Sequence, residues 1–299
     1  MAHDLDVKED YLDLPDGKLW YRINGSGSNT PILVLHGGPG AAHDYLDSLV
    51  DLASSSRRVI FYDQMGCGHS DRPDDPHKWS VEYFSKEIDV VREKLGLETV
   101  HLLGQSWGGM LAMAYMETQP SGIASLTIAS SPASVPKWIE ELGRLRAELP
   151  PDVQDTLLKH ERDGSTDSPE YEEASMVFYK RHLCRMEDWP EPLSRSLGPQ
   201  LGKQVYNTMN GPNEFHVIGT LKTFDVEKGL SDIKEPTLVT GGAYDEITPS
   251  LTQAIHKAIK GSEFTLFEAS SHCAHWEERE LFMKVVQDFI DKVEAEAKA

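Results

Sequence analysis

The chain has 299 residues, of which 39% are hydrophobic and 26% are charged, as in an ordinary folded globular protein. Its 49 acidic residues outnumber the 29 basic ones and leave a net charge of −20. Such a surface repels the phosphates of nucleic acids and of anionic membranes, so we expect neither as a partner. The N-terminal MAHDLDVKED lacks the apolar stretch of a signal peptide, and three widely spaced cysteines suit a reducing compartment. These features predict a cytoplasmic protein.

Strands and helices alternate along the first 132 residues. Two runs with strand character flank the turn residues Pro15-Asp16-Gly17, at 9–14 and 18–24. Unbroken apolar runs, which suit strands buried on both faces, follow at 31–38, 57–64, 99–106 and 122–130. Between them, the spacing of apolar residues predicts helices at about 43–54, 81–96 and 108–119. This alternation predicts an α/β fold with a doubly wound, mostly parallel sheet.

The alternation stops after residue 132 and returns near residue 230. The segment between is acidic, rich in proline and helical in pattern. The core pattern then resumes, with strands expected at 236–245 and 263–272 and helices at 250–261 and 280–297. We therefore expect one α/β core, residues 1–132 and 230–299, interrupted by a helical cap domain, residues 133–229. Long insertions of this kind cost little loop entropy and often act as lids.

A candidate nucleophile lies between the third buried strand and the helix that follows it. The sequence G-Q-S-W-G at 104–108 is a G-x-S-x-G motif in the strand–turn–helix context that this motif requires. The tight turn needs small residues on either side of Ser106 and lifts its hydroxyl above the sheet edge. The N–H of Trp107, at the start of the helix, can then face a developing oxyanion.

A second glycine motif, H-G-G-P-G at 36–40, ends the first buried strand. Glycines let the main chain approach a ligand closely with N–H groups free to donate, as in the oxyanion loops of lipases and esterases. We expect Gly38 to be the second oxyanion donor beside Trp107, with Gly37 as the alternative. Pro39 has no N–H and is excluded. Neither motif has the ligand spacing of a metal site, so no metal or other cofactor is expected.

The acid and the base are expected after the nucleophile in chain order. Asp245 and His272 each lie at the predicted carboxyl end of a strand, where ligand sites of open α/β sheets gather. His272 would take the proton of Ser106, and Asp245 would hold the imidazole tautomer. The rival residues are Glu246 and His275; the latter falls beyond the strand end, where the final helix should begin.

Taken together, these motifs resemble the proline iminopeptidases, a family of the α/β-hydrolase fold that releases N-terminal residues from small peptides. The resemblance rests first on H-G-G-P-G at 36–40, D-Q-M-G-C-G-H-S at 63–70 and G-Q-S-W-G-G at 104–109. It continues in G-P-N-E-F at 211–215, Y-D-E at 244–246 and Ser271-His272 followed by Trp276-Glu277, segments that look most like the archaeal peptide-trimming iminopeptidase. One departure is Ser271, where many members have glycine.

The resemblance implies a serine aminopeptidase that acts on a small peptide or amino-acid amide. It also implies that Glu214 of the cap and Glu246 beside the acid bind the free amine of the substrate. Two other interpretations remain open. One is an amino-acid amidase or carboxylesterase on the same triad, because amides and esters pass through the same tetrahedral intermediate. The other is a ligand-binding relative of this fold, because fold alone does not determine function.

Overall fold

The computed structural model describes residues 6–298, so six terminal residues of the predicted core lie outside the described residues. Within this range, eight strands form one sheet in the order β1-β2-β4-β3-β5-β6-β7-β8. They are β1 Val7–Leu14, β2 Gly17–Asn24, β3 Ile32–Leu35, β4 Val59–Tyr62, β5 Val100–Gln105, β6 Ile123–Ala129, β7 Thr237–Gly242 and β8 Glu263–Phe267. The first three strands in this order pair antiparallel and the rest pair parallel, which confirms the mostly parallel sheet.

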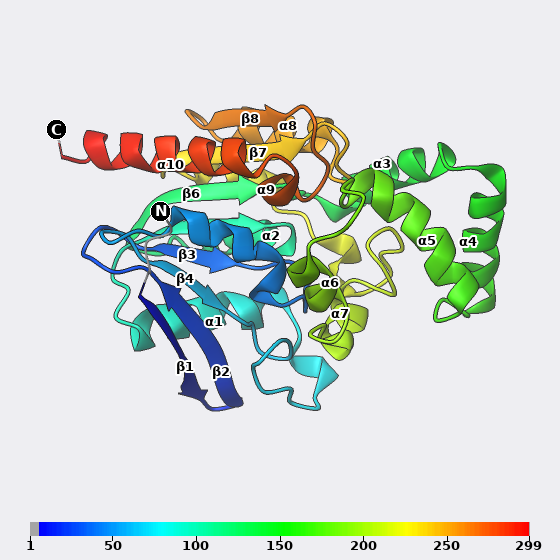
Figure 1. Ribbon diagram of the computed structural model, residues 1–299, viewed down its shortest axis with the longest axis horizontal. Coiled ribbons are helices and arrows are strands. Elements are labelled where there is room, and N and C mark those ends of the chain that lie inside the picture. Colours follow the sequence, from blue (N-terminus) through cyan, green and yellow to red (C-terminus); the bar gives the residue numbers. More distant parts are fainter. Residues whose placement is uncertain (1–5, 299) are drawn as a thin grey trace.

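Helices cover both faces of the parallel strands, which explains their unbroken apolar runs (Figure 1). One face carries α1 Val81–Lys94, α2 Trp107–Glu117, the 3-10 helix η4 Glu227–Asp232 and α8 Pro249–Ala258. The other carries the 3-10 helix η1 His43–Leu52, α9 Ala274–Glu277 and α10 Arg279–Glu296. In β3, Leu33 and Leu35 pack with the first group of helices, and Ile32 and Val34 with the second. Successive side chains of a strand point to opposite faces, so every residue of β3 must be apolar.

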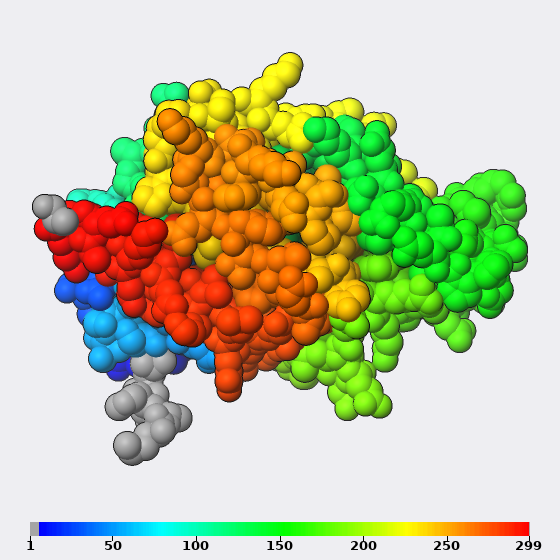
Figure 2. All heavy atoms as spheres, turned by 90° about the horizontal axis from the view of Figure 1, so that it is seen from above, coloured from blue at the N-terminus to red at the C-terminus, as the bar shows by residue number. Residues whose placement is uncertain are grey.

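A helical insert joins β6 to β7 and lies at the carboxyl ends of the parallel strands (Figure 1). It contains α3 Val135–Ala147, α4 Pro151–Asp163, α5 Pro169–His182, α6 Glu191–Leu197, α7 Lys203–Met209 and the 3-10 helix η3 Thr220–Thr223. Helices α4 and α5 pair with each other and project beyond the core, as the green spheres of Figure 2 show. Helix α6 packs instead on η1 of the core. None of the described helices is both long enough and apolar enough to span a bilayer.

Strands β7 and β8 are shorter at their carboxyl ends than the sequence predicts. They end before Asp245 and His272, so these two residues stand on loops beyond the strands rather than at the strand ends. The loop after β8 leaves the sheet because its N–H groups find other partners. The N–H of Ser271 donates to the carboxylate of Glu277, on α9, at 2.8 Å. A side chain thus replaces the neighbouring strand as the acceptor.

Candidate active site

Ser106 stands on the turn between β5 and α2, at the carboxyl edge of the sheet. Its φ of 58° and ψ of −128° are strained values that few residues other than glycine adopt. The turn depends on its flanking glycines. A Cβ on Gly104 would lie 2.2 Å from the carbonyl oxygen of Gly108, and one on Gly108 would lie 1.9 Å from that of Leu35. The sequence therefore needs glycine at both positions to present the serine in this conformation.

The loops after β7 and β8 bring Asp245 and His272 together. The Nδ1 atom of His272 lies 2.8 Å from Oδ1 of Asp245, and both side chains are buried. The same oxygen accepts the N–H of Ile247 at 2.8 Å, which fixes the carboxylate. An acceptor at this position selects the imidazole tautomer with its proton on Nδ1 and a free Nε2. His272 and Ser106 line one small cavity, so the structure brings the three predicted residues together.

Of the two expected oxyanion donors, Gly38 lines this cavity and Trp107 directly follows Ser106 in the chain. Trp107 is the first residue of α2, where a main-chain N–H has no acceptor within the helix. The two glycine candidates have different contacts: the N–H of Gly37 donates to the hydroxyl of Tyr45 at 2.8 Å, whereas Gly38 lines the cavity. The indole of Trp107 donates to the side chain of Gln64 at 2.9 Å, which ties the loop after β4 to the start of α2.

The two predicted amine-binding glutamates are both buried beside His272. Neither carboxylate oxygen of Glu246 has a hydrogen-bond partner among residues 6–298, and Nε2 of His272 lies 4.0 Å from one of them. Glu214, on the loop after α7, lines the cavity and accepts a hydrogen bond from the hydroxyl of Tyr206 at 2.5 Å. A buried carboxyl group without a partner is energetically costly. The arrangement therefore offers acceptors to a ligand that brings its own donors.

Burial and the neighbouring charges shift the pKa values of the two glutamates and of His272. Burial raises the pKa of Glu214, and it raises that of Glu246 well above the ordinary range. Burial lowers the pKa of His272, but the carboxylates of Asp245, Glu246 and Glu214 outweigh it and raise the pKa to about 9. Carboxyl groups thus surround a single imidazole in a site shielded from water. A cationic ligand group would relieve this excess of negative charge.

His275, the rival base, has a different position. It is buried, and its Nε2 lies 3.0 Å from the carbonyl oxygen of Tyr45. Burial lowers the pKa of His275 to about 3, so the ring is neutral and donates from Nε2 to that oxygen. This histidine holds main chain in place, whereas His272 faces the cavity.

No cluster of three or more histidine, cysteine or carboxylate side chains within residues 6–298 could hold a metal ion. His36, in the H-G-G-P-G motif, has a structural environment instead. Its Nε2 accepts the N–H of Gln64 at 2.9 Å, and burial lowers its pKa to about 4. The amide of Gln64 donates in turn to the carbonyl oxygen of His36 at 2.9 Å. This pair of contacts ties Gln64 to the loop that carries His36.

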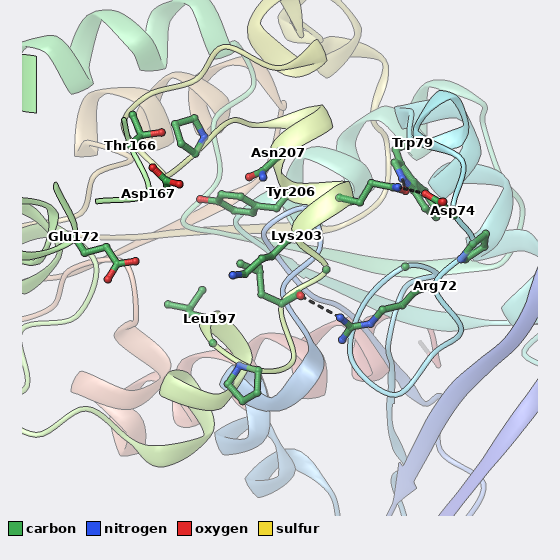
Figure 3. Close-up of a pocket in the computed structure, with 18 residues that line it drawn as sticks. Arg72, Asp74, Trp79, Thr166, Asp167, Glu172, Leu197, Lys203, Tyr206 and Asn207 are labelled. Carbon is green, nitrogen blue, oxygen red and sulfur yellow. Dashed lines mark hydrogen bonds between the residues drawn. The ribbon is translucent and has the colours of Figure 1, made fainter. Parts of the chain in front are cut away.

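The cavity over Ser106 is small and adjoins a much larger groove. Its volume is about 20 Å³, room for about one water molecule. The groove has a volume of about 1020 Å³ and lies between the insert and the loop after β4 (Figure 3). Leu197 lines both hollows, and Tyr206 lines the groove while its hydroxyl reaches Glu214. The charged side chains along the groove are Arg72, Asp74, Asp167, Glu172 and Lys203.

The sequence motifs assign no role to three residues that shape the site. Tyr45 and Gln105 both line the cavity, and Glu277 binds the hydroxyl of Ser271 at 2.9 Å. Gln105 carried a signal, because it is a polar residue at the end of an apolar strand. Tyr45 carried none, since nothing in the helical pattern around it pointed to the site.

Comparison with known proteins places the chain in a family. Residues 30–279 match the family described as alpha/beta hydrolase fold. The chain is 40% identical to a proline iminopeptidase of Saccharolobus solfataricus, covering 98% of this chain and 95% of the relative. A proline iminopeptidase of Heyndrickxia coagulans is also 40% identical, over 95% of this chain and 99% of the relative.

Solved structures agree with this placement. The crystal structure of VinJ has a TM-score of 0.92 at 40% identity, covering 96% of this chain and 99% of that chain. The proline iminopeptidase of Mycobacterium smegmatis has a TM-score of 0.89 at 39% identity, covering 97% of this chain and all of that chain. The expected resemblance is confirmed: the chain belongs to the proline iminopeptidase family of α/β-hydrolases.

Proposed function

We propose that this protein is a serine aminopeptidase that releases an N-terminal proline, or another small apolar residue, from short peptides through an acyl-enzyme. The observation that carries the proposal is the buried carboxyl group of Glu246, which has no hydrogen-bond partner among the described residues and lies 4.0 Å from His272. The N-terminal ammonium of a peptide would supply the missing donors. Membership of the proline iminopeptidase family supports the same substrate class.

In the proposed reaction, Ser106, His272 and Asp245 act as nucleophile, general base and orienting acid. Oγ of Ser106 attacks the carbonyl carbon of the first residue while Nε2 of His272 takes its proton. The N–H groups of Gly38 and Trp107 hold the oxyanion of the tetrahedral intermediate. The intermediate collapses when His272 returns the proton to the leaving nitrogen, and the peptide bond breaks. Water then attacks the acyl-enzyme by the same route and releases the free amino acid.

In this scheme, Glu214 and Glu246 bind the free amine of the substrate. Two carboxylates facing one ammonium form charge-assisted hydrogen bonds, which are strong where water is excluded. Burial raises the pKa of both glutamates, because water is excluded from around their charged forms. An arriving ammonium stabilises the carboxylates. Substrates without a cationic N-terminus would find these groups unpaired.

We further propose that residues 133–229 form a cap domain over the core of residues 1–132 and 230–299. Four side chains of this segment line the cavity above Ser106, and they are Leu183, Leu193, Leu197 and Glu214. A cavity of about 20 Å³ cannot hold a proline ring, so the cap must shift for a substrate to enter. The groove beyond Leu197 would then receive the rest of the peptide.

The proposed cellular setting is the cytoplasm, where short peptides arise from protein breakdown. All three cysteines, Cys67, Cys184 and Cys273, are free and buried. Free thiols are the normal state of cysteine in a reducing compartment.

The test compares three substrates: proline p-nitroanilide, its N-acetyl form and a p-nitrophenyl ester without an amine. The wild type should prefer the first. Glu214→Gln and Glu246→Gln should each lower kcat/KM for that substrate by about one to two powers of ten. The other two substrates should be cleaved at the same rate or slightly faster, because the lost carboxylate lowers the pKa of His272 and leaves more of it neutral. Equal losses on all three would show that the glutamates support the triad rather than bind the amine. Preference of the wild type for the acetylated substrate or the ester would contradict the aminopeptidase proposal.

A further inference from the structure

The hydroxyl of Tyr45 lies between the oxyanion loop and the nucleophile turn. It accepts the N–H of Gly37 at 2.8 Å and donates to the side-chain oxygen of Gln105. Tyr45 belongs to η1 and Gln105 is the last residue of β5, directly before Ser106. Both side chains are buried. One hydroxyl therefore connects the loop that carries Gly38 to the turn that carries the serine.

Gln105 extends this connection to the third catalytic loop. Its side-chain nitrogen donates to the main-chain carbonyl oxygen of His272 at 3.0 Å. This contact determines the direction of each hydrogen bond that links Gly37, Tyr45, Gln105 and His272. A carbonyl oxygen can only accept, so the amide nitrogen must face His272 and the amide oxygen must face Tyr45. The tyrosine hydroxyl then has to donate to Gln105, and it keeps a lone pair for the N–H of Gly37.

The main chain of Tyr45 is fixed from the opposite side. Its carbonyl oxygen accepts hydrogen bonds from Nε2 of His275 at 3.0 Å and from the indole of Trp276 at 2.6 Å. Both donors are on α9, immediately after the loop of His272. The position of Tyr45 is thus set by the same segment that carries the proposed base.

We propose that Tyr45 and Gln105 are a positioning pair that holds the oxyanion loop, Ser106 and His272 in register with one another. This inference rests on the proposed catalytic roles of Ser106, His272 and Gly38. The pair acts through the three loops and forms no bond to the reacting atoms. By binding the N–H of Gly37, Tyr45 also leaves the N–H of Gly38 as the donor that faces the oxyanion. Small displacements of such groups slow catalysis by about two powers of ten.

The test uses Tyr45→Phe and Gln105→Met, which keep the size of the side chains and remove their hydrogen bonds. Two rates are measured: turnover of proline p-nitroanilide and labelling of Ser106 by a fluorophosphonate, which needs no particular substrate. We expect kcat and the labelling rate to fall by about 10- to 100-fold in each variant, with KM within about twofold of the wild type. The double variant should lose about as much as either single one, because the two residues form one network.

Tyr115→Phe is the matched control. Tyr115 is also buried, and its hydroxyl also contacts two side chains, those of Asp89 and Arg92. It lies near the end of α2 that is far from the nucleophile turn. The Tyr115→Phe variant should lose some thermal stability and keep both turnover and labelling rates within about twofold of the wild type. Each rate is expressed per folded protein, determined from the unfolding curve of that variant.

Three results would overturn the proposal. One is wild-type kcat and labelling in Tyr45→Phe and Gln105→Met. Another is a raised KM with unchanged kcat and labelling, which would make Tyr45 only a wall of the pocket. The third is a loss of the same size in Tyr115→Phe, which would mean that any lost buried hydrogen bond has this effect. If the wild type is labelled at Ser106 but does not cleave proline anilides, the proposed function is wrong. The labelling rates of the variants then still test the positioning pair.

Discussion

Gly108 meets the main chain of β3 where α2 leaves the nucleophile turn. A Cβ at this position would lie 1.9 Å from the carbonyl oxygen of Leu35, which belongs to the sheet and cannot move aside. We therefore expect Gly108→Ala to lower the free energy of unfolding by roughly 3 kcal/mol or more, or to prevent soluble expression. Urea unfolding followed by circular dichroism measures the change.

Gly143→Ala is the control for this substitution. Gly143 lies on an exposed turn of α3, and a Cβ there would meet nothing within 4 Å. Alanine should raise the free energy of unfolding by up to about 1 kcal/mol, because it favours the helix. Equal stability of the two variants would show that the glycine of the motif is not required by the close approach to β3.

The carboxyl groups around His272 predict an unusual pH dependence. Burial lowers the pKa of this imidazole, but Asp245, Glu246 and Glu214 raise it to about 9. The base acts only when neutral, so labelling of Ser106 by a fluorophosphonate should rise with pH through a midpoint near 9, well above the ordinary value of about 6.5. The reagent has no amine, so its own titration does not enter the profile.

Glu246→Gln isolates the cause of this shift. Removing one negative charge destabilises the imidazolium, so the pKa of His272 should fall and the midpoint of labelling should move to lower pH by about half a unit or more. Glu263→Gln, an exposed change on β8, should leave the midpoint where it is. A midpoint that stays constant in Glu246→Gln would remove this glutamate from the electrostatics of the base.

Among the secondary-structure elements, α6 anchors the insert to the core. Nε of Arg195 lies 2.5 Å from Oδ1 of Asp44, which is only 2% exposed, and the hydroxyl of Ser196 both accepts from and donates to the main chain of Ala42. Arg195→Met leaves a buried carboxylate without its main cation. Because the arginine is itself a third exposed, we expect a moderate loss of about 1 to 3 kcal/mol in the free energy of unfolding.

Arg162→Met is the matched control for the anchor. Arg162 lies 3.5 Å from Asp163, and both side chains are well exposed on α4, so its loss should change stability by less than about 0.5 kcal/mol. Urea unfolding compares the two variants. An effect of Arg195→Met no larger than that of Arg162→Met would show that this contact does not hold the insert.

Among the secondary-structure elements, the sequence predicted those features that depend on the local pattern of residues. The apolar runs predicted the parallel strands, and the G-x-S-x-G motif predicted a tight turn that is stereochemically possible only with its glycines. The true ends of β7 and β8 could not be read in the same way. Beyond β8, for example, the N–H of Ser271 donates to the side chain of Glu277 on α9, and strand propensity does not reveal such a contact.

The connections within the candidate site were the least predictable feature. Tyr45 and Gln105 are 60 positions apart in the chain and meet only because η1 packs against the carboxyl edge of the sheet. Periodicity describes which face of a helix is buried, but it does not say which residue that face will meet. The same holds for the carboxyl group of Glu246, which finds no hydrogen-bond partner among residues 6–298, a fact that only the three-dimensional structure reveals.

The charge of the whole molecule bears on how a substrate approaches. The chain has a net charge of −20, and the carboxyl groups of Asp245, Glu246 and Glu214 gather around the proposed base. A peptide with a protonated N-terminus and no other charge is a cation at its reacting end. The field of an acidic protein raises the local concentration of such a substrate, and the attraction weakens as salt screens it.

Raising the ionic strength should therefore slow the enzyme only on cationic substrates. The screening length falls from about 30 Å at about 10 mM salt to about 3 Å at about 1 M. Over this range we expect kcat/KM for proline p-nitroanilide to fall by about two- to fivefold, mainly through association. Labelling of Ser106 by a neutral fluorophosphonate serves as the reference, because it reports the same nucleophile without a charge on the reagent. If salt slowed both rates equally, the effect would lie in the catalytic groups and not in the approach of the substrate. A constant kcat/KM would show that the acidic surface contributes nothing to capture, and that the buried glutamates alone distinguish the amine.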